Sequence, residues 1–203
     1  MRATFQPIAI FTLLMGAVDW NNELSAQSLD ALRAGVVSTR NLAHKPLKAA
    51  RREFDRGLRA SETGRSTEAL RHFTAAVDSD PEYLEAQAYL GRLYLLQGEP
   101  SLGLKHIEQA LSIEPSSDVL HSNRAAALMM LQRPAEAEQA ARRALQLAPA
   151  SIAAHYMLGL ALLRQNRATK ETAEHLKIAA GKYPDVLPWL AWVRERLAAT
   201  PRK

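Results

Sequence analysis

Five of the six histidines recur at fixed places along the chain, and histidine is the commonest side chain to bind a metal. His72, His106 and His175 share one recurring column, and His121 and His155 share a second. A zinc site needs several ligands within about 2 Å of one ion. Columns with a period near 34 residues instead place one histidine in each unit, with neighbours about a helix diameter of 10 Å apart. The pattern therefore indicates sequence duplication and predicts no metal site.

Other catalytic chemistry finds no support in the residue types. The chain has no cysteine, which excludes thiolate zinc sites, cysteine nucleophiles and disulfide frameworks. It also lacks a glycine-rich phosphate loop, a nucleophile elbow and a metalloprotease helix. The acidic pair Asp78 and Asp80 lies beside Pro81, where charge at a helix end and solvation account for it. We therefore expect neither enzymatic activity nor a cofactor.

An internal repeat predicts the helices on which the recurring histidines lie. Pro81, Pro115 and Pro149 are each 34 residues apart, and Pro184 follows after 35. A fixed period of about 34 residues is the signature of a helix-turn-helix repeat array. Small residues recur with the same period, at Gly57, Gly91, Ala125 and Gly159 on one expected helix and at Ala76, Ala110, Ala144 and Ala179 on the next. Nine glycines and ten prolines in 203 residues also favour a mostly helical protein.

The second unit carries the residues through which the chain resembles the tetratricopeptide repeat family: Leu90, Gly91, Tyr94, Gly98, Ala110 and Pro115. The resemblance covers about residues 46–184 and implies an all-α fold, a superhelical solenoid of antiparallel helix pairs. It divides the chain into four units, at about 50–83, 84–117, 118–151 and 152–186, followed by a capping helix at 185–199 and a tail at 200–203. The family implies binding to other proteins, as a scaffold or adaptor.

In this family the first helix of each unit lines a concave groove, and the resemblance assigns that lining residue by residue. The candidate partner-binding residues are Phe54, Leu58, Ala88, Arg92, Leu95, Ser122, Ala126, Met129, Tyr156, Leu160 and Leu163. Because most of them are small or apolar, the groove suits an apolar helix or extended segment of a partner protein. The alternative is a groove filled by residues 27–45 or by the terminal helix. A clamp for terminal carboxylates, known in this family, is not expected, because only Asn123 matches its pattern.

Basic residues concentrate at the start of the array, although the whole chain has only 26 lysines and arginines against 21 acidic residues. Lys48, Arg52, Arg56 and Arg59 form one stripe along the expected first helix. Such a stripe usually only solubilises a helix face. The alternative function is a weak contact with an acidic partner or an anionic envelope surface. Nucleic acid is disfavoured as a partner, because no aromatic residues interleave with the stripe to stack on bases.

The first 26 residues are typical of a secretory signal peptide. The apolar run at residues 8–18 has eleven residues, whereas a membrane-spanning helix needs about 20. A cleavage site with small residues is expected after the sequence Leu24-Ser25-Ala26. We therefore expect a periplasmic or secreted protein without a transmembrane span in the mature chain, and the alternative is a membrane anchor formed by an uncleaved N-terminus. Residues 27–45 do not fit the period and are left unassigned.

Overall fold

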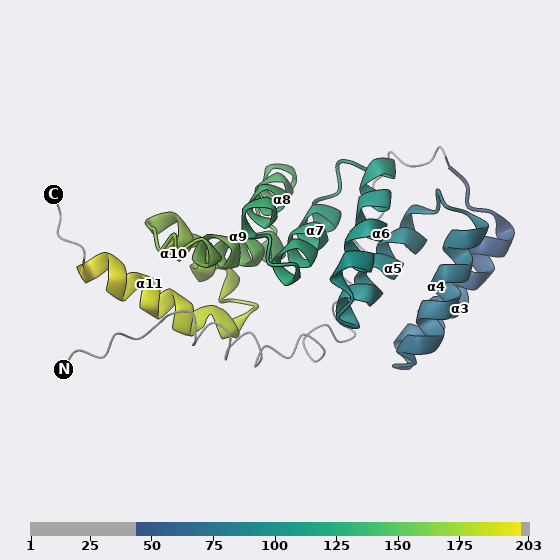
Figure 1. The fold of residues 1–203 in the computed structure, drawn as a ribbon, viewed down its shortest axis with the longest axis horizontal. Coiled ribbons are helices and arrows are strands. Elements are labelled where there is room, and N and C mark those ends of the chain that lie inside the picture. Colours follow the sequence, from purple (N-terminus) through teal and green to yellow (C-terminus); the bar gives the residue numbers. More distant parts are fainter. Residues whose placement is uncertain (1–43, 200–203) are drawn as a thin grey trace.

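The computed structural model describes residues 44–199, and this part of the chain is helical apart from short connections (Figure 1). The helices, labelled as in Figure 1, are α3 (Lys48–Glu62), α4 (Ser66–Ser79), α5 (Leu84–Leu96), α6 (Pro100–Ile113), α7 (Asp118–Met130), α8 (Pro134–Leu147), α9 (Ile152–Arg164), α10 (Lys170–Ala179), the 3-10 turn η1 (Pro184–Val186) and α11 (Leu187–Ala199). The predicted signal peptide at 1–26, nearly all of the segment at 27–45 and the tail at 200–203 lie outside the described residues. Among the described helices, none has the length and apolar character needed to cross a membrane.

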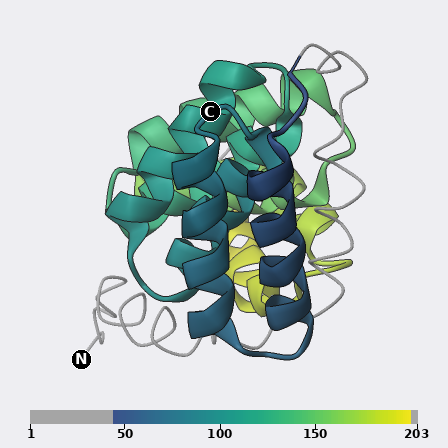
Figure 2. The same ribbon diagram turned by 90° about the vertical axis from the view of Figure 1, so that its right-hand side faces the viewer.

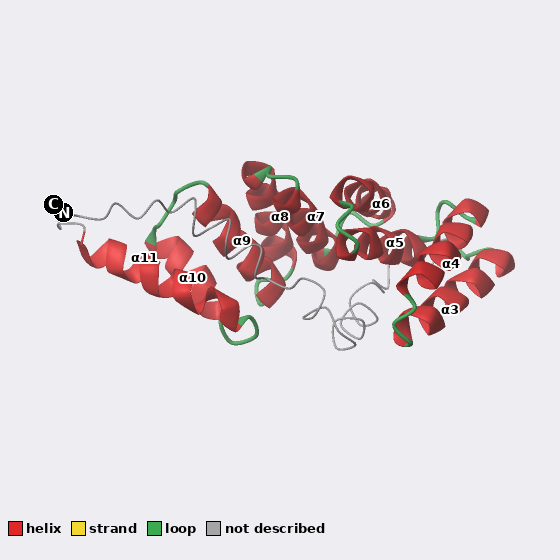
Figure 3. Ribbon diagram, turned by 60° about the horizontal axis from the view of Figure 1, so that its bottom comes forward, coloured by secondary structure: helices red, strands yellow, loops and turns green. Residues whose placement is uncertain are grey.

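Consecutive helices form pairs, and the pairs stack into an elongated array (Figure 1). Helix α3 packs on α4, α5 on α6, α7 on α8, and α9 on α10, while α11 packs on α10 at the far end. Figure 2 shows α3 and α4 lying antiparallel at the near end, with the later pairs behind them, and Figure 3 shows the same order from another side. The second helix of each pair also contacts the first helix of the next. The expected all-α array of antiparallel helix pairs is therefore confirmed.

One residue with a left-handed backbone closes the first helix of every pair. Gly64 and Gly98 have φ angles of 72° and 76°, and Gln132 and Asn166 have φ angles of 59° and 57°. In all four turns the next residue donates its backbone N–H to the carbonyl five residues earlier, at 2.9 Å, which satisfies the end of the helix. Glycine adopts this conformation without strain. The same turn thus forms in all four pairs, although the residue type changes.

Prolines and one insertion set the start of the second helices. Pro100 and Pro134 lie at the first positions of α6 and α8, where a missing N–H removes no helical hydrogen bond. Residues 63–65 join α3 to α4, whereas the longer stretch 165–169 joins α9 to α10. Thr169 then caps α10 by accepting a hydrogen bond from the backbone N–H of Thr172. The extra residue of the fourth unit therefore lies in this longer turn.

Two hydrophobic clusters hold the described pairs together. One fills the first two pairs around Phe73, which is 1% exposed, and the other fills the later pairs around Leu128 and Leu158. At the far end, α11 turns Leu190 and Val193 into the second cluster. Because each cluster draws on neighbouring pairs, the stability of one pair depends on the pair stacked next to it.

Candidate functional site

The first helices of the pairs, α3, α5, α7 and α9, form one side of the array. Helix α5 contacts α7 directly, and α7 contacts α9. The described second helices, α4, α6, α8 and α10, do not contact one another as closely as α5 contacts α7 or α7 contacts α9. The array therefore bends towards the side of its first helices. We call the surface formed by α3, α5, α7 and α9 the inner face.

All eleven predicted partner-binding residues lie on the four inner-face helices, but most of them have little solvent exposure. Those at most 8% exposed are Phe54, Ala88, Arg92, Ser122, Met129, Tyr156, Leu160 and Leu163. Leu58, Leu95 and Ala126 are partly exposed. The side chain of Leu95 also packs against Gly103: a β-carbon at Gly103 would lie only 2.5 Å from Leu95 Cδ2. Leu58, Leu95 and Ala126 are thus the predicted apolar residues that keep exposed surface.

Phe54 is a core residue, which corrects its assignment to the partner-binding lining. Its ring centroid lies 5.5 Å from that of Phe73, 5.0 Å from that of Tyr83 and 5.3 Å from that of Tyr89. Tilted and edge-on rings at these distances attract one another beyond the effect of their buried area. Since Tyr83 is the N-cap residue of α5 and Tyr89 lies within α5, Phe54 joins the first pair to the second.

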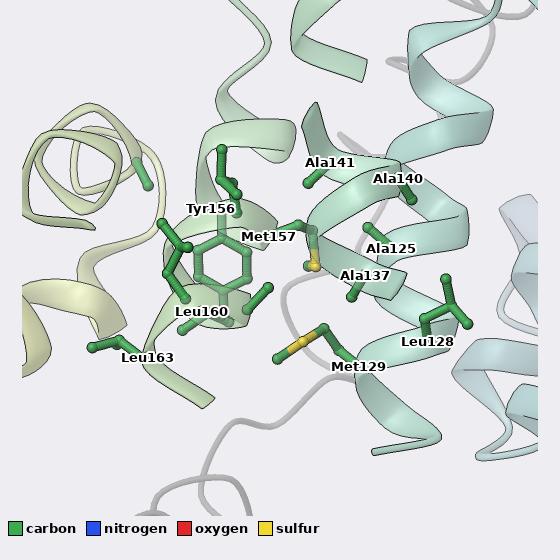
Figure 4. Close-up of a cluster of buried hydrophobic side chains, with 14 of the residues drawn as sticks. Ala125, Leu128, Met129, Ala137, Ala140, Ala141, Tyr156, Met157, Leu160 and Leu163 are labelled. Atoms are coloured by element: carbon green, nitrogen blue, oxygen red, sulfur yellow. The ribbon is translucent and has the colours of Figure 1, made fainter. Parts of the chain in front are cut away.

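Tyr156 is held by the segment that follows α10. Its hydroxyl donates to Asp185 Oδ2 at 2.8 Å, and its ring centroid lies 4.5 Å from that of Tyr183. Figure 4 shows Tyr156 beside Leu160, with Met129 approaching from the neighbouring helix. The part of the inner face on α9 is therefore stabilised by contacts within the array, and Tyr156 has a structural role there.

Arg92 places a cation in the middle of the inner face. The residue is 6% exposed. Burial lowers the pKa of Arg92 to about 10, while the nearby Tyr89 and Tyr183 act in the opposite direction. The guanidinium therefore stays charged at neutral pH. A carboxylate interacts more strongly with a buried cation than with an exposed one, because water screens the pair less. Arg92 thus keeps a positive charge within the buried part of the inner face.

The predicted basic stripe lies on the exposed side of α3. Lys48, Arg52, Arg56 and Arg59 are all exposed. Arg56 donates to Glu53 at 2.5 Å. Within residues 44–199, no acidic side chain forms an ion pair with Lys48, Arg52 or Arg59. The stripe therefore presents three of its charges to solvent at one end of the described array.

The two histidine columns face each other inside the helix pairs, a relation that the sequence reasoning missed. His155 Nδ1 lies 2.7 Å from His175 Nδ1, and Gln87, at the place of His155 in the second pair, bonds to His106 at 2.8 Å. His155 and His175 are 20 residues apart in the sequence, and Gln87 and His106 are 19 apart. This recurring separation is the sequence signal from which the facing positions could have been found. No group of three or more histidine or acidic side chains in the described part of the chain could hold a metal ion.

Comparison with protein families identifies the repeat. Two models of the tetratricopeptide repeat (TPR) match the chain, at residues 54–118 and at residues 119–151. The matched stretches run from α3 to the turn that precedes α9. No curated protein sequence matches the chain significantly.

Solved structures with low sequence identity share the fold. A crystal structure of MamA superposes with a TM-score of 0.65 and 19% identity, over 74% of this chain and 84% of that one. MamA 41-end from Desulfovibrio magneticus RS-1 gives a TM-score of 0.66 and 18% identity, over 76% and 88%. The first TPR of Spaghetti (RPAP3), bound to the HSP90 peptide SRMEEVD, gives a TM-score of 0.57 and 21% identity, over 62% and 98%. At these identities the likeness concerns the fold alone.

Proposed function

Because the chain is a tetratricopeptide repeat protein, we propose that it is a protein-interaction scaffold whose inner face binds an apolar segment of a partner. One observation carries the proposal. Leu58, Arg92 and Ala126 occupy the same place in three successive first helices. The two apolar residues are partly exposed, and they flank a buried cation. A matching partner is an apolar segment, helical or extended.

The expected affinity is modest. Each apolar side chain that becomes fully buried contributes roughly 1.5 to 3 kcal/mol. Association costs about 4 to 15 kcal/mol in lost freedom of motion. Because few inner-face side chains keep exposed surface, we expect a dissociation constant in the micromolar range, which corresponds to about 8 kcal/mol. The scaffold is proposed to act by binding alone, without catalysis.

The partner is proposed to differ from the peptide bound by the RPAP3 domain. That domain holds the HSP90 peptide SRMEEVD. Of the basic and asparagine side chains through which related repeats grip a terminal carboxylate, this chain has only Asn123 at a matching place. The Nδ2 atom of Asn123 is buried. The peptide SRMEEVD is therefore a suitable negative control for any binding measurement.

Replacing Leu58 with glutamate is expected to weaken partner binding by about tenfold to a hundredfold, because a charge replaces apolar contact worth about 1.5 to 3 kcal/mol. The matched control is Leu102→Glu on α6, an equally large apolar residue that is 41% exposed outside the inner face. Proteins captured from a cell extract by the wild type and both variants are quantified by mass spectrometry. The dissociation constant of the best candidate is then measured by calorimetry.

Selective loss from Leu58→Glu, with retention by Leu102→Glu, is the expected pattern. Circular dichroism is used to check that both variants are folded. Equal capture by the two folded variants, or saturable binding of SRMEEVD, would contradict the proposal.

A second candidate function rests on the exposure of the basic stripe. We propose that Lys48, Arg52 and Arg59 make a weak, salt-dependent contact with an anionic surface, since each nearby cation contributes about 1 kcal/mol to such binding. Sedimentation with vesicles containing 30% phosphatidylserine is expected to fall at least severalfold in Arg52→Glu and also in high salt, where charges are screened. Arg71→Glu on α4, an exposed residue off the stripe, is the control. Binding that survives both changes would rule the contact out.

Export to the periplasm or medium stays a prediction, as does the alternative of a membrane anchor. Both concern residues 1–26, which lie outside the described part. The mature N-terminus, determined by mass spectrometry, distinguishes the two.

A further inference from the structure

A side-chain hydrogen bond joins the same two places of the first, second and fourth helix pairs. The bonded residues are Glu53 with His72 at 2.7 Å, Gln87 with His106 at 2.8 Å, and His155 with His175 at 2.7 Å. In the second and fourth pairs, the residue on the first helix also reaches back to a proline carbonyl, Pro81 at 2.9 Å or Pro149 at 3.0 Å. Among these three bridges, only the bridge of the fourth pair consists of two imidazoles. We call it the fourth bridge.

The geometry of the fourth bridge determines where its protons lie. The Pro149 carbonyl can only accept, so His155 Nε2, at 3.0 Å, must carry a hydrogen and donate it. The Nδ1 atom of a neutral His155 is then an acceptor. His175 Nδ1 must therefore donate to it across the 2.7 Å separation. The remaining nitrogen, His175 Nε2, lies 3.9 Å from Glu171 Oε1.

The folded bridge accommodates one extra proton but not two. A first proton can bind His175 Nε2, where it faces the Glu171 carboxylate and leaves the hydrogen bond between the rings intact. A second proton would have to bind His155 Nδ1, which already accepts the N–H of His175. Two N–H groups would then face each other across 2.7 Å in rings that are both charged. An unfolded chain has no such restriction, and both histidines bind a proton in acid.

The groups around the bridge come from three helices. Burial lowers the pKa of His175, and the neighbouring His155 and Arg142 of α8 lower it further. Glu171 and Glu174, on α10 itself, act in the opposite direction. Arg142 also forms an ion pair with Glu171 at 2.6 Å. The Glu171 carboxylate therefore interacts with Arg142 as well as with His175. Both rings are largely buried, with His155 8% exposed and the His175 side chain 17% exposed.

We infer that the bridge between His155 and His175 is an acid-sensitive latch, which strengthens the packing of α10 on α9 at neutral pH and, on acidification, raises the fraction of molecules in which α10 and α11 have detached. Helix α11 follows because it packs on α10. This inference goes beyond the proposed function, since the opening of the array requires no partner. Its consequence for binding is that, in acid, more molecules have an α9 that is no longer covered by α10, while α9 stays packed on α7 and α8.

The sign of the pH dependence follows from the proton count. Stability rises with pH wherever the unfolded state binds more protons than the folded state. An unfolded histidine has a pKa of about 6.5. Because the closed pair binds at most one proton and the pKa of His175 is lowered there, the open pair binds at least one proton more than the closed pair in acid. The latch is therefore intact above about pH 7. Below about pH 6.5, the ratio of open to closed molecules rises at least about tenfold for each pH unit.

The chain supplies its own control for the latch. In His155→Gln, the glutamine amide can donate to the Pro149 carbonyl and accept from His175, as Gln87 does with Pro81 and His106. Such a bridge has no second site for a proton. The variant thus keeps the hydrogen bonds and removes only the protonation that opens the latch.

Backbone hydrogen exchange of the full chain, read by mass spectrometry, tests the inference. Between pH 7.5 and pH 5.5, and after correction for the intrinsic exchange rate, protection of α10 and α11 is expected to fall about tenfold more in the wild type than in His155→Gln. Burial also lowers the pKa values of His106 and His121, so α5 to α8 also lose protection, by equal amounts in both proteins. The same loss in α10 and α11 of both proteins would overturn the inference.

A second measurement on the wild type requires no variant. Nitrogen-15 NMR of the histidine rings is expected to show a hydrogen on His155 Nε2, bonded to the Pro149 carbonyl, for as long as α9 and α10 stay paired. The closed pair of rings is expected to take up a single proton in total, because one hydrogen lies between the two Nδ1 atoms. Uptake of two protons by the closed pair would contradict the latch. Neither experiment involves a binding partner, so failure of the proposed function leaves the latch unaffected.

Discussion

Replacing Phe73 with alanine is expected to lower the free energy of unfolding by about 3 to 5 kcal/mol. The side chain is 1% exposed, and its ring packs 5.5 Å from Phe54 and 5.4 Å from Tyr89, centroid to centroid. The same ring fills the space left by Gly57, where a β-carbon would lie 2.5 Å from Phe73 Cε1. Alanine would leave a cavity at the joint between the first two pairs. Urea denaturation followed by circular dichroism measures the loss.

The control for Phe73→Ala is Arg71→Ala on the same helix. Arg71 is exposed, and substitutions of exposed side chains change stability by less than about 0.5 kcal/mol. Because each pair is stabilised by its neighbours, the first transition of the Phe73 variant is expected to be the unfolding of α3 and α4. A loss no larger than that of Arg71→Ala would mean that the aromatic cluster does not hold the first pair in place.

Replacing Gly91 with valine is expected to lower the free energy of unfolding by about 2 to 3 kcal/mol, through overpacking. A β-carbon at Gly91 would lie 2.9 Å from Ile107 Cγ1, 3.0 Å from the Gly103 carbonyl oxygen and 3.1 Å from the Ile107 backbone nitrogen. Two of these atoms belong to the backbone, so α5 and α6 must separate to make room. Thermal unfolding of the purified variant provides the measurement.

The control for Gly91→Val is Gly98→Ala in a turn, which changes the backbone preference without adding close contacts. Gly98 has a φ of 76° and no atom within 4 Å of a β-carbon built on it. Gly98→Ala is therefore expected to lose only about 1 kcal/mol, from the left-handed backbone. If Gly91→Val were no less stable than Gly98→Ala, close contact between α5 and α6 would not be required for the fold.

The sequence was sufficient to predict the repeated elements. Prolines and small residues with a period near 34 mark helix ends and close contacts, and both effects act between residues near in the chain or within one unit. The turn at Gly64 could be recognised from its residue type. The identical turn at Gln132 could be recognised only from its place in the period, because glutamine has no preference for a left-handed backbone.

The candidate site was harder to predict from the sequence. Repeat position correctly placed the eleven residues on the first helices, but it did not show which of them are covered. Phe54 and Tyr156 share the same repeat position as Ala88. The first is enclosed by aromatic rings of the next pair, and the second is bonded to Asp185. Residue type at one position therefore does not distinguish a partner-binding residue from one that joins two pairs.

The sequence by itself determined that the chain forms stacked helix pairs, because the periodic pattern and the turn residues act locally and recur in every unit. Only the tertiary structure decided which inner-face residues keep their surface and which histidines meet. His155 and His175 are 20 residues apart, and Tyr156 and Asp185 are 29 apart. Contacts over such distances depend on how each helix is rotated against its neighbours. That rotation follows from the packing of side chains on both helices at once, which the pattern of a single helix does not contain.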